Sequence, residues 1–345
     1  MGAFTKKIYG PDYSFGFQCL AEKCRHSCCI GWEIDIDDKS LQRYRLVPGE
    51  LGRKLHDCIR DPKDETDENG EDTCAHFILG KDERCPFLNE RGLCDLILNL
   101  GEDSLCEICT EHPRFYNIFS DHTEMGYGLC CEEAARLLFT WQTPIRLAET
   151  DSVPSEEEHI GEDPEEAEIL QIREELFSLL QDRGCNLSDR FRNILNAVDL
   201  PERSMYLDYA FWGRVLGSLE RLDPSWDAEI TKLASSTIEP SQIQHFMDLM
   251  SEKDRIFEYE NLMWYFLYRH LGEVTDKEEI RDIVLWALLS VEILEYLGAS
   301  RYLEKGAFTL DDQIDLARMF SSEIEYSDEN IECMTGHIRE RNYLL

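Results

Sequence analysis

The stretch from Phe17 to Asp37 reads FQCLAEKCRHSCCIGWEIDID and decides what the N-terminal part of the chain is, because it holds four cysteines in eleven residues. Eight more cysteines follow before residue 132, so twelve of the fourteen fall in this part of the chain: Cys19, Cys24, Cys28, Cys29, Cys58, Cys74, Cys85, Cys94, Cys106, Cys109, Cys130 and Cys131. Thiols this dense bind a metal, form disulfides or carry redox chemistry.

The cellular compartment in which we expect the protein favours one of these three explanations over the others. The start of the chain, MGAFTKK, has no apolar stretch of signal-peptide length, and we expect no later window to reach the roughly 18 apolar residues of a membrane span. We therefore expect a cytoplasmic protein that does not enter a membrane. Cytosolic thiols stay reduced, which favours metal ligation over disulfides.

The spacing of the cysteines leaves zinc and iron–sulfur both open. Structural zinc is often held by two C-x2-C knuckles, and only Cys106 and Cys109 have that spacing. The proline that follows Cys85 is typical of an iron–sulfur ligand. The C-x3-C-x2-C loop of radical S-adenosylmethionine enzymes is excluded here, because Cys24 and Cys28 are followed by Gly31 at the third position.

Five islands of sequence resemble the flagellin lysine-N-methylase (FliB-like) family and, with it, a wider group of cysteine-rich zinc/iron-chelate domains. The islands are Phe17–Asp37, Cys85–Asn89, Gly92–Cys94 with Asn99–Glu102, Leu105–Cys109 with His112–Arg114, and Cys131–Arg136. The chain departs from the family pattern after Cys131, where Glu132 stands in place of an expected proline. Cys106 and Cys130 are extra to the pattern.

The resemblance implies a set of metal ligands and an activity. The ligands that carry over are Cys19, Cys24, Cys28, Cys29, Cys85, Cys94, Cys109 and Cys131. The implied cofactors are an iron–sulfur cluster of the 4Fe-4S type, with zinc as the alternative metal, and S-adenosyl-L-methionine. The implied reaction is N-methylation of lysine side chains, and the implied partner is flagellin.

The composition of the chain indicates which classes of partner it is expected to bind. It has 35 Lys and Arg against 71 Asp and Glu, a net charge of −36, so we expect no nucleic-acid binding. An acidic surface attracts cationic partners such as a lysine-bearing substrate, although net charge is first a matter of solubility.

We predict a mainly α fold with a cysteine-rich metal-binding N-terminal domain of little strand, at residues 1–148, and an all-α helical domain at residues 169–345. The run at 149–168 holds ten acids and no Lys or Arg, which predicts an acidic linker. Apolar periodicity predicts a helix that begins near residue 169 and ends by Gly184. Further helices are expected at 38–60, 131–141, 188–198, 205–221, 240–271, 277–298, 311–326 and 328–343, with one short strand at 32–37.

Catalytic and donor-binding residues cannot be assigned from the sequence. No G-x-G-x-x-G follows a credible strand, and Gly126-Tyr127-Gly128 is too short for a nucleotide loop. Asp35, Asp37 and Tyr127 are candidates by position only. Histidines near metal sites more often contact ligands than bind the metal, so we do not count those of this region (His26, His76 and His112) as ligands.

Two function classes therefore stand. One is a lysine N-methyltransferase with an iron–sulfur cluster. The alternative is a non-enzymatic cysteine-rich zinc/iron-chelating protein that acts as a metal carrier or adaptor.

Overall fold

The computed structural model describes residues 4–61, 74–155, 164–201 and 207–341, and the chain divides into two compact units. Residues 18–114 form the first, here called the cysteine unit, and residues 1–17 with 115–345 form the second, the helical unit. The cysteine unit is thus an insertion into the helical unit. This division differs from the expected boundary at 148, since residues 1–17 and 115–148 belong with the C-terminal helices. Part of the expected linker, 156–163, lies outside the described residues.

The prediction of a mainly α fold is confirmed. The helical unit contains ten α-helices among its described residues: α5 (Glu132–Thr140), α6 (Pro164–Leu180), α7 (Leu187–Ala197), α8 (Tyr209–Leu216), α9 (Pro224–Ser235), α10 (Pro240–Glu252), α11 (Phe257–His270), α12 (Lys277–Lys305), α13 (Leu310–Phe320) and α14 (Asp328–Glu340). A π-helical turn, Ser321–Glu325, follows α13. From α6 onward the described residues form helices and no strand, as the sequence predicts.

Some expected helices have other bounds. The expected helix at 240–271 is two helices, α10 and α11, which are separated where Asp254 has a positive φ of 55°. Helix α9 was not predicted, although its signals are present: Asp223 caps it by accepting a hydrogen bond from Ser225, and Pro224 is its first residue.

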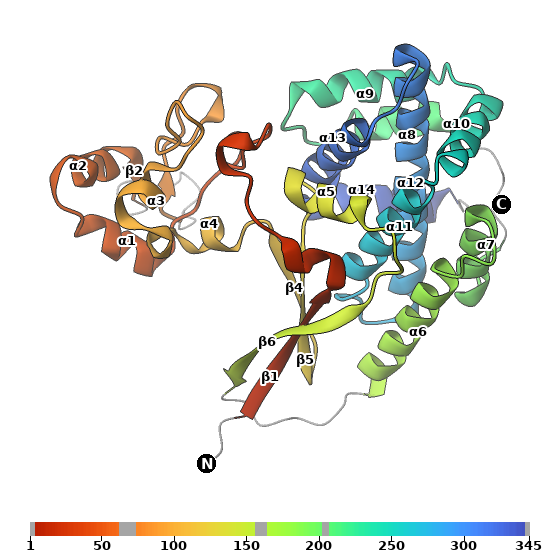
Figure 1. Cartoon of the computed structure of the whole chain (residues 1–345), viewed down its shortest axis with the longest axis horizontal. Helices are drawn as coiled ribbons and strands as arrows, with labels where there is room; N and C mark the ends of the chain where they lie inside the picture. The colour runs from red at the N-terminus through yellow and green to blue at the C-terminus, as the bar shows by residue number, and fades with distance from the viewer. Residues whose placement is uncertain (1–3, 62–73, 156–163, 202–206, 342–345) are drawn as a thin grey trace. The chain divides into compact units, whose positions relative to one another are not determined.

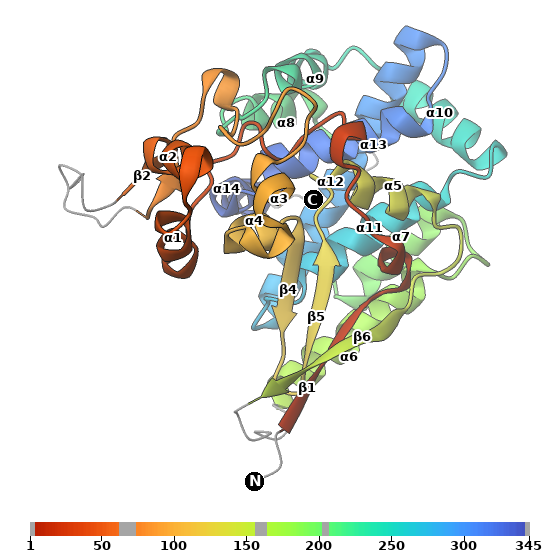
Figure 2. The same ribbon diagram turned by 60° about the vertical axis from the view of Figure 1, so that its left-hand side comes forward.

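A four-stranded sheet in the helical unit was also not predicted. Its order is β4 (Arg114–Ile118), β5 (His122–Tyr127), β1 (Phe4–Pro11) and β6 (Leu147–Ser155). Strand β1 pairs parallel with β5 and antiparallel with β6, and Figures 1 and 2 show these three strands side by side, with α6 along them. Its segments come from far apart in the sequence, so local alternation was a weak signal.

The core of the helical unit is built around α11 and α12. In α11 all residues from Phe257 to Tyr268 are buried, which agrees with the core role that the aromatic run favours. By length and composition α12 could cross a membrane, contrary to the expectation that no window would reach that length. However, 83% of its most apolar window is buried inside the protein, as in a core helix.

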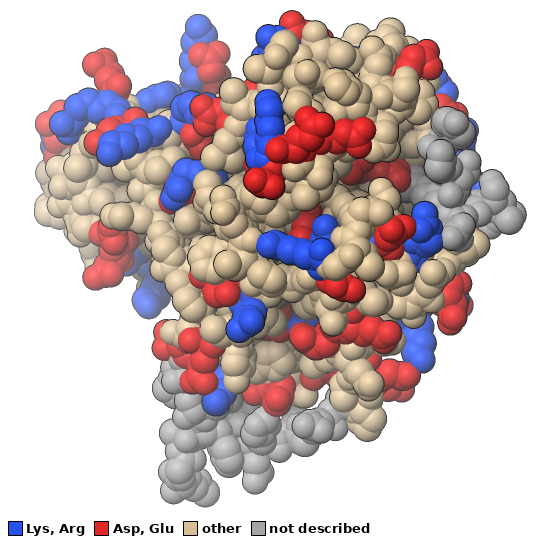
Figure 3. Space-filling view, turned by 45° about the vertical axis from the view of Figure 1, so that its right-hand side comes forward, with Lys and Arg blue, Asp and Glu red and all other residues tan. Residues whose placement is uncertain are grey.

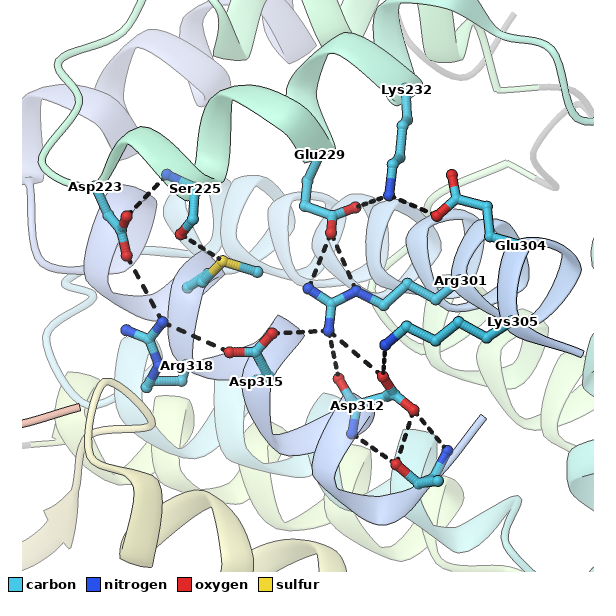
Figure 4. A network of polar contacts seen from close by, with 12 residues as sticks. Asp223, Ser225, Glu229, Lys232, Arg301, Glu304, Lys305, Asp312, Asp315 and Arg318 are labelled. Carbon is cyan, nitrogen blue, oxygen red and sulfur yellow. Dashed lines mark hydrogen bonds and ion pairs between the residues drawn. The ribbon is translucent and has the colours of Figure 1, made fainter. Parts of the chain in front are cut away.

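A polar network joins α9, α12 and α13 inside this unit (Figure 4). The guanidinium of Arg301 donates to Glu229 at 2.9 and 3.1 Å and lies 2.8 Å from the Asp315 carboxylate. Arg318 pairs with Asp223 and Asp315 at 3.8 and 3.7 Å. Since the arginines are nearly buried, each carboxylate offsets a charge that would otherwise be costly to bury.

The cysteine unit has short elements around a small core. Its elements are α1 (Asp38–Arg45), α2 (Gly49–Cys58), β2 (Ile59–Arg60), β3 (His76–Phe77), α3 (Asp95–Leu100) and α4 (Glu107–Glu111). The predicted helix at 38–60 is α1 and α2, which are separated before Gly49 at φ 78°. The predicted strand at 32–37 is reduced to one bridge, between Asp35 and His76. Ile34, Ile36, Phe77 and Phe87 form the centre of the core.

Candidate metal centre

Two of the cysteine loops are held together by backbone hydrogen bonds. The N–H of Cys85 donates to the carbonyl of Cys29 at 2.8 Å, and the N–H of Gly31 donates to the carbonyl of Glu83 at 3.1 Å. Gly31 has a φ of 82°, a conformation that favours glycine. The sequence after the Cys28–Cys29 pair therefore folds so that it lies along the segment that carries Cys85.

A tight turn brings Cys94 back beside the same segment. Leu88 and Cys94 form a β-bridge, and the N–H of Asp95 donates to the carbonyl of Phe87 at 2.7 Å. The side chain of Asn89 accepts from the N–H groups of Arg91 and Leu93 at 2.9 and 3.1 Å, which fixes the turn. The pattern Cys-Pro-Phe-Leu-Asn…Gly-Leu-Cys is thus the sequence of one closed loop with a cysteine at each end.

The thiols of these loops interact with one another. Cys29 hydrogen-bonds with the Cys28 thiol, which lowers the pKa of Cys29 to about 7 against the effect of its burial. Burial, together with the charges of Cys29 and Cys94, raises the pKa of Cys85 to about 12. Burial and the Cys29 charge likewise raise the pKa of Cys94.

A second pair of thiols lies against the first set. Cys106 and Cys109 hydrogen-bond with each other, and this bond raises the pKa of Cys109 while it lowers that of Cys106. Charges on Cys29 and Cys85 also act on Cys109. We call the whole group the thiol cluster: Cys28, Cys29, Cys85, Cys94, Cys106 and Cys109.

The cluster is a soft, electron-rich donor set. Because each ionised thiol opposes ionisation of its neighbours, several thiolates can coexist there only if a cation compensates them. Thiolates select zinc, copper(I) and iron–sulfur clusters over hard cations. The thiols present are therefore the donor type that such a metal takes.

For the other three predicted ligands, the contacts that the structure describes are of a different kind. Cys19 is exposed and accepts from the N–H of Ala21 at 3.4 Å, and the Cys24 thiol donates to the carbonyl of His26 at 3.3 Å. Cys131 belongs to the helical unit, where it precedes α5 as the N-cap residue. Its neighbour Cys130 is buried, and burial raises the pKa of that thiol to about 12.

Asp37 and Tyr127, which are candidates for catalysis by their position in the sequence, both contact other residues of the fold. Asp37 caps α1 by accepting from Ser40 at 2.9 Å, and it also accepts from the N–H of Glu107 at 2.9 Å. Burial would raise its pKa, but these hydrogen bonds lower it. Tyr127 is stacked on Phe17 with ring centroids 4.1 Å apart.

One group of polar side chains that the sequence did not reveal lies beside the bridge between Asp35 and His76. One donor atom each of Glu33, Asp35 and His76 lies within 4.8 Å of the others. Glu33 and Asp35 are two residues apart in the chain, and the bridge from Asp35 to His76 adds the imidazole. The other histidine of interest, His112, is largely buried, which lowers its pKa to about 4.

Comparisons with known proteins show what the chain is similar to. Residues 214–344 match the FliB lysine N-methylase C-terminal domain. Two proteins named Lysine-N-methylase, from Salmonella typhimurium (strain LT2) and Salmonella choleraesuis (strain SC-B67), are each 26% identical to the chain over 140 residues. In this part of its length the chain is similar to the FliB-like family. The flagellar biosynthetic protein FliU of Salmonella muenchen is likewise 26% identical, over 143 residues.

These matches cover only part of this chain and, for two of the relatives, only part of the relative. Each aligned stretch is 40% of this chain and 34% of the two lysine-N-methylases, so the match spans about a third of their length. For FliU it is 41% of this chain and 82% of that relative. No solved structure matches the chain. The matched family domain begins in α8 and includes α9 to α14, outside the five islands that carry the resemblance in the sequence.

Proposed function

We propose that this protein transfers methyl groups from S-adenosyl-L-methionine to lysine side chains of flagellin and that it carries an iron–sulfur cluster. The observation that carries this proposal is the match of residues 214–344 to the C-terminal domain of FliB lysine N-methylases. The names of the relatives, Lysine-N-methylase and flagellar biosynthetic protein FliU, support the reaction and the flagellar substrate.

The reaction sets requirements that the protein must meet. A lysine amine has a pKa of about 10.4 and is mostly protonated at neutral pH, so it must be deprotonated before it can attack the sulfonium methyl. Nitrogen, methyl carbon and sulfur must then be held in line. Net charge −36 favours the approach of a lysine-bearing surface. On the face in Figure 3, acidic side chains lie among scattered Lys and Arg.

The proposed cluster is held by cysteines of the family pattern. We propose Cys28, Cys29, Cys85, Cys94 and Cys109 as the principal candidates, since they interact within one unit, and retain Cys19, Cys24 and Cys131 as further candidates. A bound cluster would supply folding free energy to a unit with a small core. Amine methylation requires no electron, so the cluster has a structural role in this proposal.

The alternative function is a metal carrier or adaptor without catalysis. The thiol cluster favours it as well, because a chelating domain alone would account for these contacts. The two proposed functions differ in whether the protein binds the methyl donor, because only a methyltransferase binds S-adenosyl-L-methionine.

Anaerobic purification followed by analysis of iron, acid-labile sulfide and zinc tests the cofactor. We expect iron with sulfide, and stoichiometric zinc without sulfide would contradict the cluster. Calorimetric titration with S-adenosyl-L-methionine tests the enzyme. Heat of binding with a single-site isotherm supports the methyltransferase, whereas no binding by metal-replete protein supports the carrier.

A further inference from the structure

We propose that Cys106, which the family pattern leaves out, is a ligand of the metal centre in the cysteine unit, and that the Tyr44 hydroxyl donates a hydrogen bond to its sulfur. This inference rests on the metal centre of the proposed function and adds to it one ligand and one side chain that positions that ligand.

The position of Cys106 carries the first part. Its side chain is 1% exposed, and it packs in the core of the cysteine unit together with Cys85. It hydrogen-bonds with Cys109, which in turn lies close enough to Cys29 and Cys85 to feel their charge. Cys106 is therefore connected to Cys29 and Cys85 through its C-x2-C partner Cys109, which the family pattern does include.

Tyr44 supplies an independent observation. It is 2% exposed, and its hydroxyl has no hydrogen-bond partner of acceptable geometry among the described residues. The hydroxyl nevertheless lies beside the Cys106 and Cys109 thiols. A buried hydroxyl without a partner is costly, and a metal-bound thiolate is a stronger acceptor than a thiol. A thiolate at Cys106 would give Tyr44 its missing partner.

Helix α1 holds the segment that ends in Cys106. Arg43 donates to the carbonyl of Ser104 at 3.0 Å and to that of Leu105 at 2.8 Å. On the other side of Cys106, the N–H of Glu107 donates to Asp37 at 2.9 Å. Since these contacts fix the backbone before and after Cys106, its sulfur is preorganised beside Tyr44, as a ligand requires.

Cys58 shows what a plain thiol in the same unit looks like. It also packs against the core, and burial raises its pKa. The charges that act on it come from Lys54 and Asp57 and not from other cysteines. Cys58 is thus the matched control for Cys106.

The test reconstitutes the full chain anaerobically with iron and inorganic sulfide and compares wild type with Cys106→Ser, Cys85→Ser and Cys58→Ser. Iron and sulfide per chain, visible absorption and far-UV circular dichroism are measured. We expect Cys106→Ser to lose at least half of its iron, as Cys85→Ser does, while Cys58→Ser matches wild type. Wild-type iron and an unchanged spectrum in Cys106→Ser would overturn the inference. If wild type itself takes up no iron, the proposed cluster fails, and the inference fails with it.

Tyr44→Phe gives a second readout that keeps every thiol in place. Removing a hydrogen bond to a ligating sulfur leaves more negative charge on the metal centre, so its reduction potential should shift downward at unchanged iron content. Tyr259→Phe is the control, since that hydroxyl is also buried without a partner but lies in α11. If Cys106→Ser fails to fold, the comparison of Tyr44→Phe with Tyr259→Phe tests the inference in its place. An equal potential in Tyr44→Phe, Tyr259→Phe and wild type would overturn the inference.

Discussion

Gly128 is required by the side chain of Tyr326, because a Cβ atom at residue 128 would overlap the tyrosine hydroxyl and lie 3.0 Å from the Arg269 guanidinium. Gly126 is required in the same way by the ring of Phe115. The two glycines of Gly126-Tyr127-Gly128, which are too few for a nucleotide loop, are thus explained by close packing. Gly126 packs against Phe115 of the neighbouring strand β4, and Gly128, just after β5, packs against Tyr326 and Arg269.

We predict that Gly128→Ala destabilises the helical unit by about 1–3 kcal/mol, the usual cost of forcing an extra carbon into a packed site. In Gly128→Ala/Tyr326→Phe the nearest atom is gone, so the two changes should cost less together than the sum of each alone. Urea denaturation measures both. Gly336→Ala in α14 is the control, since no atom lies within 4 Å of the added carbon. Equal losses at residues 128 and 336 would contradict the packing argument.

The buried pair Glu124–Arg173 should make stability depend on pH. Arg173 donates to Glu124 at 2.9 and 2.5 Å, and both side chains are 2% exposed. Burial would raise the pKa of Glu124, but its hydrogen bond with His122 and the charge of Arg173 lower it below 4.5. A lowered folded-state pKa contributes stability that is present above pH 4.5 and lost as the pH falls through the folded-state value.

Glu124→Gln should therefore cost about 3–5 kcal/mol at pH 7, because it leaves Arg173 buried without its partner. The difference from wild type should shrink as the pH falls below 4.5. Glu149→Gln removes an exposed pair with Lys7 and should change stability by less than about 1 kcal/mol. A difference between Glu124→Gln and wild type that stays constant with pH would show that the carboxylate does not act as described.

Metal should contribute to the stability of the cysteine unit. We expect Cys28→Ser and Cys85→Ser to lower metal content and to make residues 18–114 sensitive to protease, since metal binding to such sites is worth roughly 10 kcal/mol or more. Cys333→Ser, in α14, is the control. Limited proteolysis with mass spectrometry locates the cuts. If Cys28→Ser and Cys85→Ser both stay metal-replete and resistant, those cysteines are not ligands.

Electrostatic steering should make methyl transfer sensitive to salt. If the net charge of −36 attracts a lysine-rich substrate, kcat/KM should fall as the Debye length decreases from about 10 Å at 0.1 M salt to about 3 Å at 1 M. Steady-state rates across this range measure the effect. A rate that is independent of salt would remove steering and leave the reaction itself unaffected.

The parts of the fold that the sequence predicts are those with local signals. Helix α7 appears at 187–197, where 188–198 was expected, because a capping Asn186 and apolar periodicity are both local. The sheet was missed because β1 pairs with strands that begin at His122 and Leu147, far along the chain. For the same reason the cysteine unit is an insertion that ends at Arg114, which local composition does not mark.

The candidate site shows the same limit. Spacing identified the cysteine-dense loops, but it could not reveal that Cys85 hydrogen-bonds to Cys29 or that Tyr44 lies beside Cys106. These contacts depend on the packing of α1 and on the turn fixed by Asn89. The family pattern likewise places Cys106 outside the ligand set. We propose it as a ligand because its thiol contacts that of Cys109.

The most direct test of the central claim incubates the metal-replete protein with flagellin and methyl-labelled S-adenosyl-L-methionine, without a reductant, and locates the label by mass spectrometry. The account predicts label on lysine side chains of flagellin, and none when the protein is omitted. No label on any lysine, together with no binding of S-adenosyl-L-methionine by the same metal-replete preparation, would contradict it.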